Sequence, residues 1–167
     1  VILRDVAGTS VLTSTKVYGS VAYHQMINAG SLVSLGFNVG WANKQINTSN
    51  LTFPSQWNGK FFDVHQTTTA PKLDRNNINY LDMQVGMNYA YFPTNDIYLN
   101  AGFSALHVNR PKESFFNDES GGNNRVPVRY TGFLNGSIKL NDRVIVNPNV
   151  YGSLQANAWE VVGGLNA

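Results

Sequence analysis

The sequence predicts an all-β fold, specifically an antiparallel transmembrane β-barrel of the outer-membrane type, of which we count about eight strands here. Low charge content, alternating strands and uneven connections predict it. Charged residues make up 13% of the 167 residues, whereas soluble domains contain about 25%. Polar residues interrupt every apolar segment before it reaches the roughly 18 residues that a membrane-spanning helix needs. A membrane location would therefore require strands.

Alternation of apolar and polar residues with a period of two identifies the strands. In the segment 32–46, Leu35, Phe37 and Trp41 share one face, and small or polar residues occupy the other. The segment 130–140 fits less well, because Phe133 stands among polar positions such as Asn135. The other segments with this alternation are 79–91, 97–105, 144–155 and 159–166.

The connections predict how the strands are arranged. Asn28–Gly30, Pro93–Asp96 and Asn141–Asp142 have the composition of tight turns. The remaining connections are longer: Asp5–Ser10 is moderate, Asn43–Asn77 is very long and Asn109–Arg129 is long. Short and long connections thus alternate in strict order, which is typical of outer-membrane barrels with short periplasmic turns and extended outer loops. We expect residues 1–167 to form part of a single domain of this kind.

The residue types exclude several kinds of chemistry. The chain has no cysteine, so it has no disulfides, thiolate metal sites or cysteine nucleophile. His24, His65 and His107 lie far apart without metal-ligand spacing, which favours hydrogen-bonded structural roles. A Gly-x-Ser-x-Gly elbow and a phosphate-binding loop are both missing from the sequence. The net charge of +2, with scattered cations, argues against nucleic-acid binding. We expect no enzyme and no cofactor.

The first long connection is rich in aromatic residues. Phe53, Trp57, Phe61 and Phe62 make it too apolar for a free coil of this length. We expect the segment to pack as a lid or to enter the lumen, which would make it either a plug or a docking surface. These four residues are therefore candidates for partner binding.

The second long connection combines charges with paired aromatic residues, a mixture found where proteins bind partners. An equally supported alternative is that Phe115 and Phe116 fold back onto the barrel rim. The segment Asn117–Asn124 offers oxygen ligands for calcium, but its spacing differs from the EF-hand loop, so a solvated loop tip is favoured. The candidate partner-binding residues here are Arg110, Lys112, Glu113, Phe115 and Phe116.

Polar residues at alternating strand positions are expected to face the lumen. They would line an aqueous pathway or satisfy one another across a filled interior, and the sequence leaves both possibilities open. These residues are Asp82, Gln84, Asn88, Asn135 and Lys139.

Several stretches, in order along the chain, resemble the PorP/SprF family of Bacteroidetes outer-membrane proteins. The most similar are Leu106–Phe116, Arg129–Tyr130 and Lys139–Asp142. The similarity extends over essentially the whole chain. The other similar stretches are Asp5–Gly8, Ala22–His24, Ser34–Gly36, Leu51–Phe53 and Gln56–Gly59.

The resemblance implies an outer-membrane component of the type IX secretion and gliding machinery. Its partners would be exported surface proteins such as adhesins, other secretion components and outer-membrane lipid. Family members are longer and carry a signal peptide, and the segment 163–167 brings no closing aromatic strand, so we expect a fragment that lacks the signal peptide and C-terminal strands. Two alternatives are a general diffusion porin with a polar lumen and a soluble β-sandwich whose apolar faces point inward.

Overall fold

The computed structural model describes residues 1–8, 11–47, 53–63, 65–66, 73, 75–116 and 124–167. It is one eight-stranded antiparallel sheet in which every strand pairs with its neighbours in chain order. A 3-10 turn, η1 (Pro54–Gln56), lies in the described part of the first long connection. The strands are β1 (Ile2–Ala7), β2 (Leu12–Asn28), β3 (Ser31–Ile46), β4 (Asn77–Thr94), β5 (Ile97–Leu106), β6 (Arg129–Asn141), β7 (Val144–Gln155) and β8 (Ala158–Asn166).

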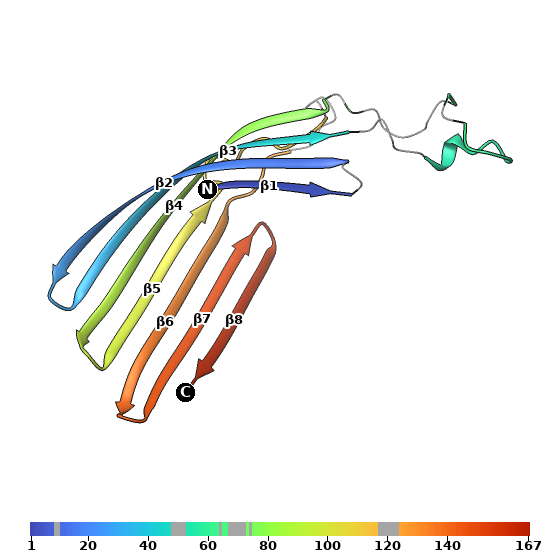
Figure 1. Cartoon of the computed structure of the whole chain (residues 1–167). Helices are drawn as coiled ribbons and strands as arrows, with labels where there is room; N and C mark the ends of the chain where they lie inside the picture. The colour runs from blue at the N-terminus through green and yellow to red at the C-terminus, as the bar shows by residue number, and fades with distance from the viewer. Residues whose placement is uncertain (9–10, 48–52, 64, 67–72, 74, 117–123) are drawn as a thin grey trace.

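The sheet is curved into a trough and remains open (Figure 1). Strands β1 and β8 form its two edges, and no pairing joins them among the described residues. The predicted all-β antiparallel fold with about eight strands is confirmed. Within the described part of the chain, no helix is long and apolar enough to cross a membrane.

Strand register aligns the apolar residues on the outer face of the trough. Large apolar side chains remain solvent-exposed over this face, as Val21 (74%) and Trp159 (75%) illustrate. The buried apolar residues among those described are few, with Ala42 and Ile78 as examples, so the sheet has no ordinary core and needs lipid against this face. One row of paired outer-face residues runs Val21, Phe37, Val85, Ala105, Tyr130, Leu154 and Trp159.

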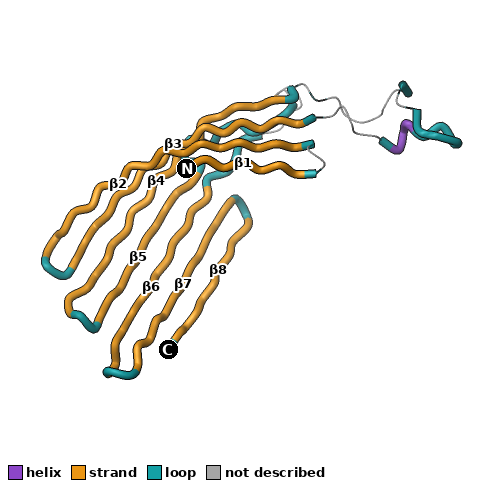
Figure 2. The backbone as a smooth tube through the Cα atoms, in the orientation of Figure 1, coloured by secondary structure: helices purple, strands orange, loops and turns teal. Residues whose placement is uncertain are grey.

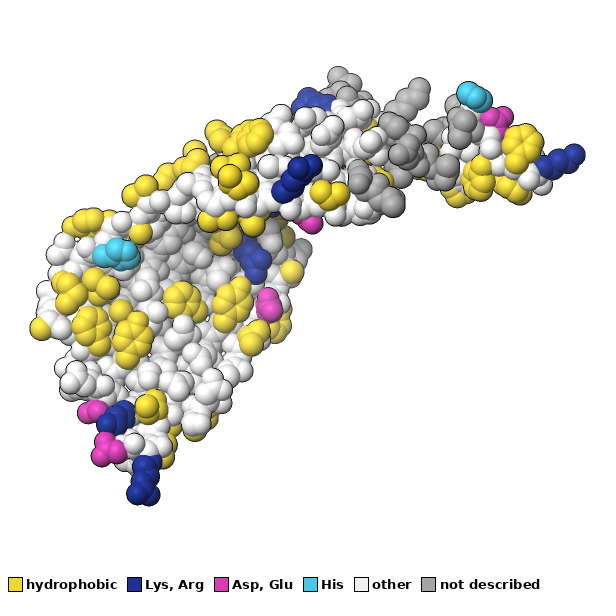
Figure 3. All heavy atoms as spheres, viewed as in Figure 1, with side chains coloured by type: hydrophobic (Ala, Val, Ile, Leu, Met, Phe, Trp, Pro, Cys, Tyr) yellow, Lys and Arg dark blue, Asp and Glu magenta, His cyan; other side chains and the backbone are white. Residues whose placement is uncertain are grey.

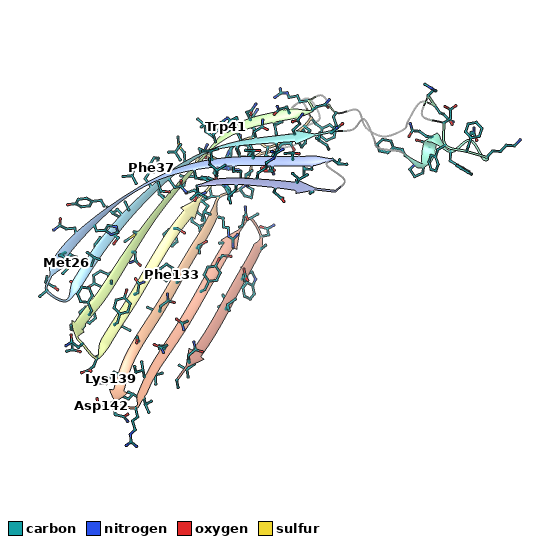
Figure 4. All side chains as sticks on the ribbon, viewed as in Figure 1. Met26, Phe37, Trp41, Phe133, Lys139 and Asp142 are labelled. Atoms are coloured by element: carbon teal, nitrogen blue, oxygen red, sulfur yellow. The ribbon has the colours of Figure 1, made fainter. Side chains whose placement is uncertain are left out.

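The hollow face is lined by small and polar side chains, and it is the mostly white surface in Figure 3. Two aromatic rings fit there because each lies over a glycine. A Cβ added to Gly102 would lie 2.4 Å from Cε1 of Phe133, and one added to Gly40 would lie 2.2 Å from Cε1 of Tyr18. This packing explains why Phe133 departs from the alternation of β6: its ring belongs to the hollow side (Figure 4).

The connections at the two ends of the sheet differ in length, as Figure 2 shows. Two-residue turns at 29–30, 95–96 and 142–143 lie at one end. The connections at the other end include the long ones, 47–76 and 107–128. The expected strict alternation is wrong at the last connection, since Ala156 and Asn157 join β7 to β8 in a tight turn at the long-loop end. Ala156 makes this turn with a positive φ of 52°, which the sequence did not signal.

Candidate functional site

The candidate site lies on the hollow face at the long-loop end, where the connection 107–128 meets β2, β3 and β4. Its centre is Asp82, whose side chain is 1% exposed. Nδ1 of His107 lies 2.7 Å from Oδ1 of Asp82, Nε2 of Gln84 donates to Oδ2 at 3.2 Å, and the Tyr18 hydroxyl donates to Oδ2 at 3.4 Å. A buried carboxylate needs such partners, because an unpaired charge there is costly.

The backbone after β5 continues along β4 and brings His107 to Asp82. His107 and Arg110 have positive φ values of 58° and 45°, which non-glycine residues adopt only at a cost. Between them, Asn109 Nδ2 donates to the Leu81 carbonyl at 2.6 Å, and Asn109 Oδ1 accepts from the Met83 amide at 3.1 Å. Asn109 therefore supplies hydrogen-bond partners for backbone groups at the edge of β4, beyond the point where β5 ends. It also holds the start of the loop against the sheet.

A second attachment lies further along the same loop, at Glu113. Its carboxylate accepts a hydrogen bond from the Tyr80 hydroxyl at 2.7 Å and forms an ion pair with Lys44. Burial raises the pKa of the Glu113 carboxyl, but the hydrogen bonds from Lys44 and Tyr80 lower it more, so the pKa lies below its ordinary value. Glu113 is thus held as a carboxylate that joins the loop to β3 and β4.

Asp82, Gln84, Asn88 and Asn135 occupy the hollow face, in agreement with the expected lumen positions. Lys139 occupies the same face near a short turn, where its Nζ lies 2.7 Å from Oδ1 of Asp142 (Figure 4). Several buried amide oxygens have no hydrogen-bond partner in the structure, and they belong to Asn38, Asn88 and Asn100. The middle of the trough is therefore polar and largely uncharged.

The aromatic residues of the first long connection lie outside this site. Trp57 and Phe62 pair across a small bridge with ring centroids 5.3 Å apart. The Asn58 side-chain oxygen accepts from the amides of Lys60 and Phe61, and the Gln56 side-chain oxygen accepts from the Phe53 amide. The segment 53–63 extends away from the sheet (Figure 1), so the expectation that it forms a lid or enters the lumen is wrong for the described structure. Its local hydrogen bonds hold it together without the sheet.

The second group of candidate residues divides between two environments. Glu113 is held on the hollow face, whereas Lys112 and Phe116 are exposed. Phe115 is half-buried and its carbonyl accepts from the Arg75 amide at 3.1 Å, while Arg110 accepts a backbone hydrogen bond from the Arg125 side chain. The alternative in which both phenylalanines fold back therefore describes Phe115 better than Phe116. A role of these residues in partner binding stays a prediction.

Two of the three histidines, His24 and His107, have the hydrogen-bonded roles that the sequence predicted. His24 Nδ1 lies 2.7 Å from the Ser34 hydroxyl, and His107 contacts Asp82. The described residues contain no group of three or more His, Asp or Glu side chains that could hold a metal ion. Of the segment proposed for calcium, Asn117–Asn123 lies outside the described residues.

Sequence reasoning missed Lys44, Tyr80 and Tyr18 as parts of this cluster. All three alternate onto the polar side of their strands near the long-loop end. Their position on the polar side of the strands, near the long-loop end, could have identified them as candidates, because polar residues there lie closest to the long loops. Their partners were not visible, since Glu113 follows Lys44 by 69 residues.

Comparisons with known proteins agree with this architecture. The sequence profile of the family described as type IX secretion system membrane protein PorP/SprF matches residues 1–162. Neither the curated proteins nor the solved structures include a significant match to the chain. The family match covers all but the last residues, and the all-β sheet with its apolar outer face is that of an outer-membrane protein. The chain therefore belongs to the PorP/SprF family and is a membrane component of the type IX secretion system, located in the bacterial outer membrane.

Proposed function

We propose that this protein binds exported surface proteins, such as adhesins, through its long outer loops and performs no catalysis itself. The observation that carries the proposal is the aromatic segment 53–63. Trp57, Phe61 and Phe62 are 49%, 60% and 52% exposed although local contacts order the segment. Exposed aromatic groups on an ordered segment are favourable anchors for a partner protein, since little conformational entropy is lost on binding.

The second loop supports the same function from closer to the sheet. Phe116 is 39% exposed, and Arg110 and Lys112 belong to the same stretch. The attachments through His107 and Glu113 hold this stretch at the outer end of the trough. A partner that contacts both loops would therefore meet the exposed aromatic rings of the segment 53–63 and a second surface that is attached to the sheet.

The test uses full-length protein with Phe61→Ala, because Phe61 is the most exposed of the three rings and is not part of the Trp57–Phe62 pair. We expect affinity purification from solubilised outer membranes to recover about tenfold less exported surface protein. Lys60→Ala, at the adjacent position, is the matched control and should leave recovery unchanged. Equal recovery with both variants would remove the basis for this docking segment.

A general diffusion porin is the second candidate, and the polar hollow face favours it. The inward attachment of the loop 107–128 through His107 and Glu113 argues against a wide outer opening. Conductance of the full-length protein in planar bilayers separates the two functions. A steady open channel would support the porin, and a closed baseline would support the secretion-partner function.

We further propose that residues 1–167 form part of one larger barrel. Strands β1 and β8 present open edges, and unpaired backbone groups are not tolerated in lipid. The chain contains no cysteine, so engineered cysteine pairs scanned along β1 and β8 give a clean cross-linking test in the full-length protein. Cross-linking between β1 and β8 would mean that eight strands close by themselves and would contradict the proposal.

A further inference from the structure

A notch of about 340 Å³ interrupts the outer face of the sheet over β4, β5 and β6. Its lining side chains have the same parity as the outer-face residues Val85, Ala105 and Tyr130 of these strands, so the notch opens toward lipid. Asn100 also borders the notch, but its side chain has the opposite parity. The side chains of outer parity are apolar apart from two hydroxyl groups, and they belong to Tyr89, Tyr91, Leu99, Ala101 and Leu134.

Small residues in the sheet create this notch. Ala101 lies between Tyr89 and Leu134 in the strand register and contributes only a methyl group. The Leu99 side chain leans over the neighbouring strand, where a Cβ added to Gly136 would lie 3.2 Å from Leu99 Cδ2. The space above Ala101 is therefore left open between larger side chains. Open space on a lipid-facing surface forfeits dispersion contacts, so a lipid chain that fills the notch is favoured.

The two tyrosines supply the polar atoms of the notch. Tyr91 lies near the end of β4, just before the short turn at 95–96, and Tyr89 lies one outer position deeper. Among the described residues, neither hydroxyl has a hydrogen-bond partner. Tyrosine at this depth is typical of the boundary between hydrocarbon and lipid headgroups. A hydroxyl in apolar surroundings is costly without a partner, so these two groups favour a ligand that brings acceptor oxygens.

We propose that this notch holds one acyl chain of a diacyl phospholipid in the periplasmic leaflet of the outer membrane. The chain lies over Ala101, and the hydroxyls of Tyr89 and Tyr91 donate to ester or phosphate oxygens of the same lipid. Short turns face the periplasm in outer-membrane barrels, which places the notch in that leaflet. Its volume lies near the lower end of the range for ligand pockets, about 300–1,000 Å³, and suits one acyl chain better than a whole lipid.

The test measures retention of added phosphatidylethanolamine by purified full-length protein in detergent, using native mass spectrometry. Ala101→Phe fills the notch, so we expect it to weaken phospholipid retention at least about tenfold. Val150→Phe is the matched control, because Val150 pairs with Leu134 in the same outer row but lies outside the notch. It should leave retention unchanged. Equal retention by the parent protein and Ala101→Phe would overturn the proposal.

A second variant guards against loss of folding in the first. Tyr91→Phe keeps the ring and removes only the hydroxyl, so it should weaken phospholipid retention by about fivefold. Tyr98→Phe is its control, because Tyr98 pairs with Ser137 on the hollow face and should not affect retention. Oleic acid and lipid A are the competing probes. Retention of either one in place of the phospholipid, lost in Ala101→Phe, would overturn the proposal and assign the notch to a free fatty acid or to an outer-leaflet lipid.

Discussion

The two long connections leave the same end of the sheet but are held in different ways. The loop 107–128 is attached to the sheet at His107, Asn109 and Glu113, through Asp82, the backbone of β4 and Lys44. The segment 53–63 has its own small structure with the Trp57–Phe62 ring pair, and its ribbon extends away from the sheet in Figure 1. The loop 107–128 continues along the sheet, whereas the segment 53–63 carries exposed aromatic rings beyond the end of the sheet.

This difference suggests a division of labour. Attachment to a buried carboxylate fixes the position of a loop, and the positive φ values at His107 and Arg110 are a cost that the attachments must offset. The contacts that order the segment 53–63 lie within the segment, between Trp57 and Phe62 and around Asn58. The attached loop is suited to shaping the outer opening, and the exposed aromatic rings of the segment 53–63 are suited to contacting a partner.

The largest expected effect follows from Asp82→Ala. The substitution leaves His107, Gln84 and Tyr18 without their shared acceptor in a buried position, which costs on the order of 3 kcal/mol. Urea unfolding of the protein in lipid vesicles should show this loss, and amide exchange should rise over 107–116 but not over 53–63. Asp142→Ala is the control, since the Asp142 side chain is 95% exposed. Equal midpoints for both variants would contradict a supporting role of Asp82.

Local rules were sufficient to predict most of the sheet. Alternation identified the outer positions of Leu35, Phe37 and Trp41, and turn composition identified the connection at Asn28–Gly30, where Asn28 Oδ1 accepts from the Gly30 amide. These features depend only on neighbouring residues in the sequence. Phe133 was harder, because its place depends on the glycine opposite it in the next strand, which only the register reveals.

The site itself was largely beyond sequence reasoning. Asp82 was expected to face the lumen, but its contact with His107 requires a non-glycine residue with a positive φ, which alternation cannot predict. Glu113 was assigned to an outer binding surface from composition, although its partner Lys44 is 69 residues away. The contact depends on the course of the loop beyond β5. Composition therefore identified the important loop without identifying the direction of its side chains.

Swapping the charges of Lys44 and Glu113 tests how strongly this ion pair holds the loop 107–128 to the sheet. We expect an effect smaller than that of Asp82→Ala. Lys44→Glu or Glu113→Lys alone places like charges together, so we expect about fivefold faster amide exchange over 107–116. The double variant restores opposite charges and should recover most of the protection. The same charge swap at the Lys139–Asp142 ion pair, next to a short turn, serves as the control. If amide exchange over 107–116 is equally fast in the double and single variants, the ion pair does not hold the loop.

The smallest expected effect is a pH dependence of the same attachment. The folded-state pKa of Glu113 is lowered, so its contribution is fully present above the pKa of an unfolded glutamate, about 4.3, and is lost as pH falls through the folded value. The attachment should therefore be intact at neutral pH and weaken only in acid. Exchange over 107–116, divided by exchange over 53–63 to remove the intrinsic pH effect, should rise by less than about fivefold below roughly pH 4.

Glu113→Gln tests whether this acid step belongs to Glu113. Glutamine still accepts a hydrogen bond from Tyr80, but it carries no charge for Lys44 and does not titrate. The variant should show faster exchange than the parent at neutral pH and no further step in acid. An acid step of the same size in the variant would contradict the assignment of the titration to Glu113.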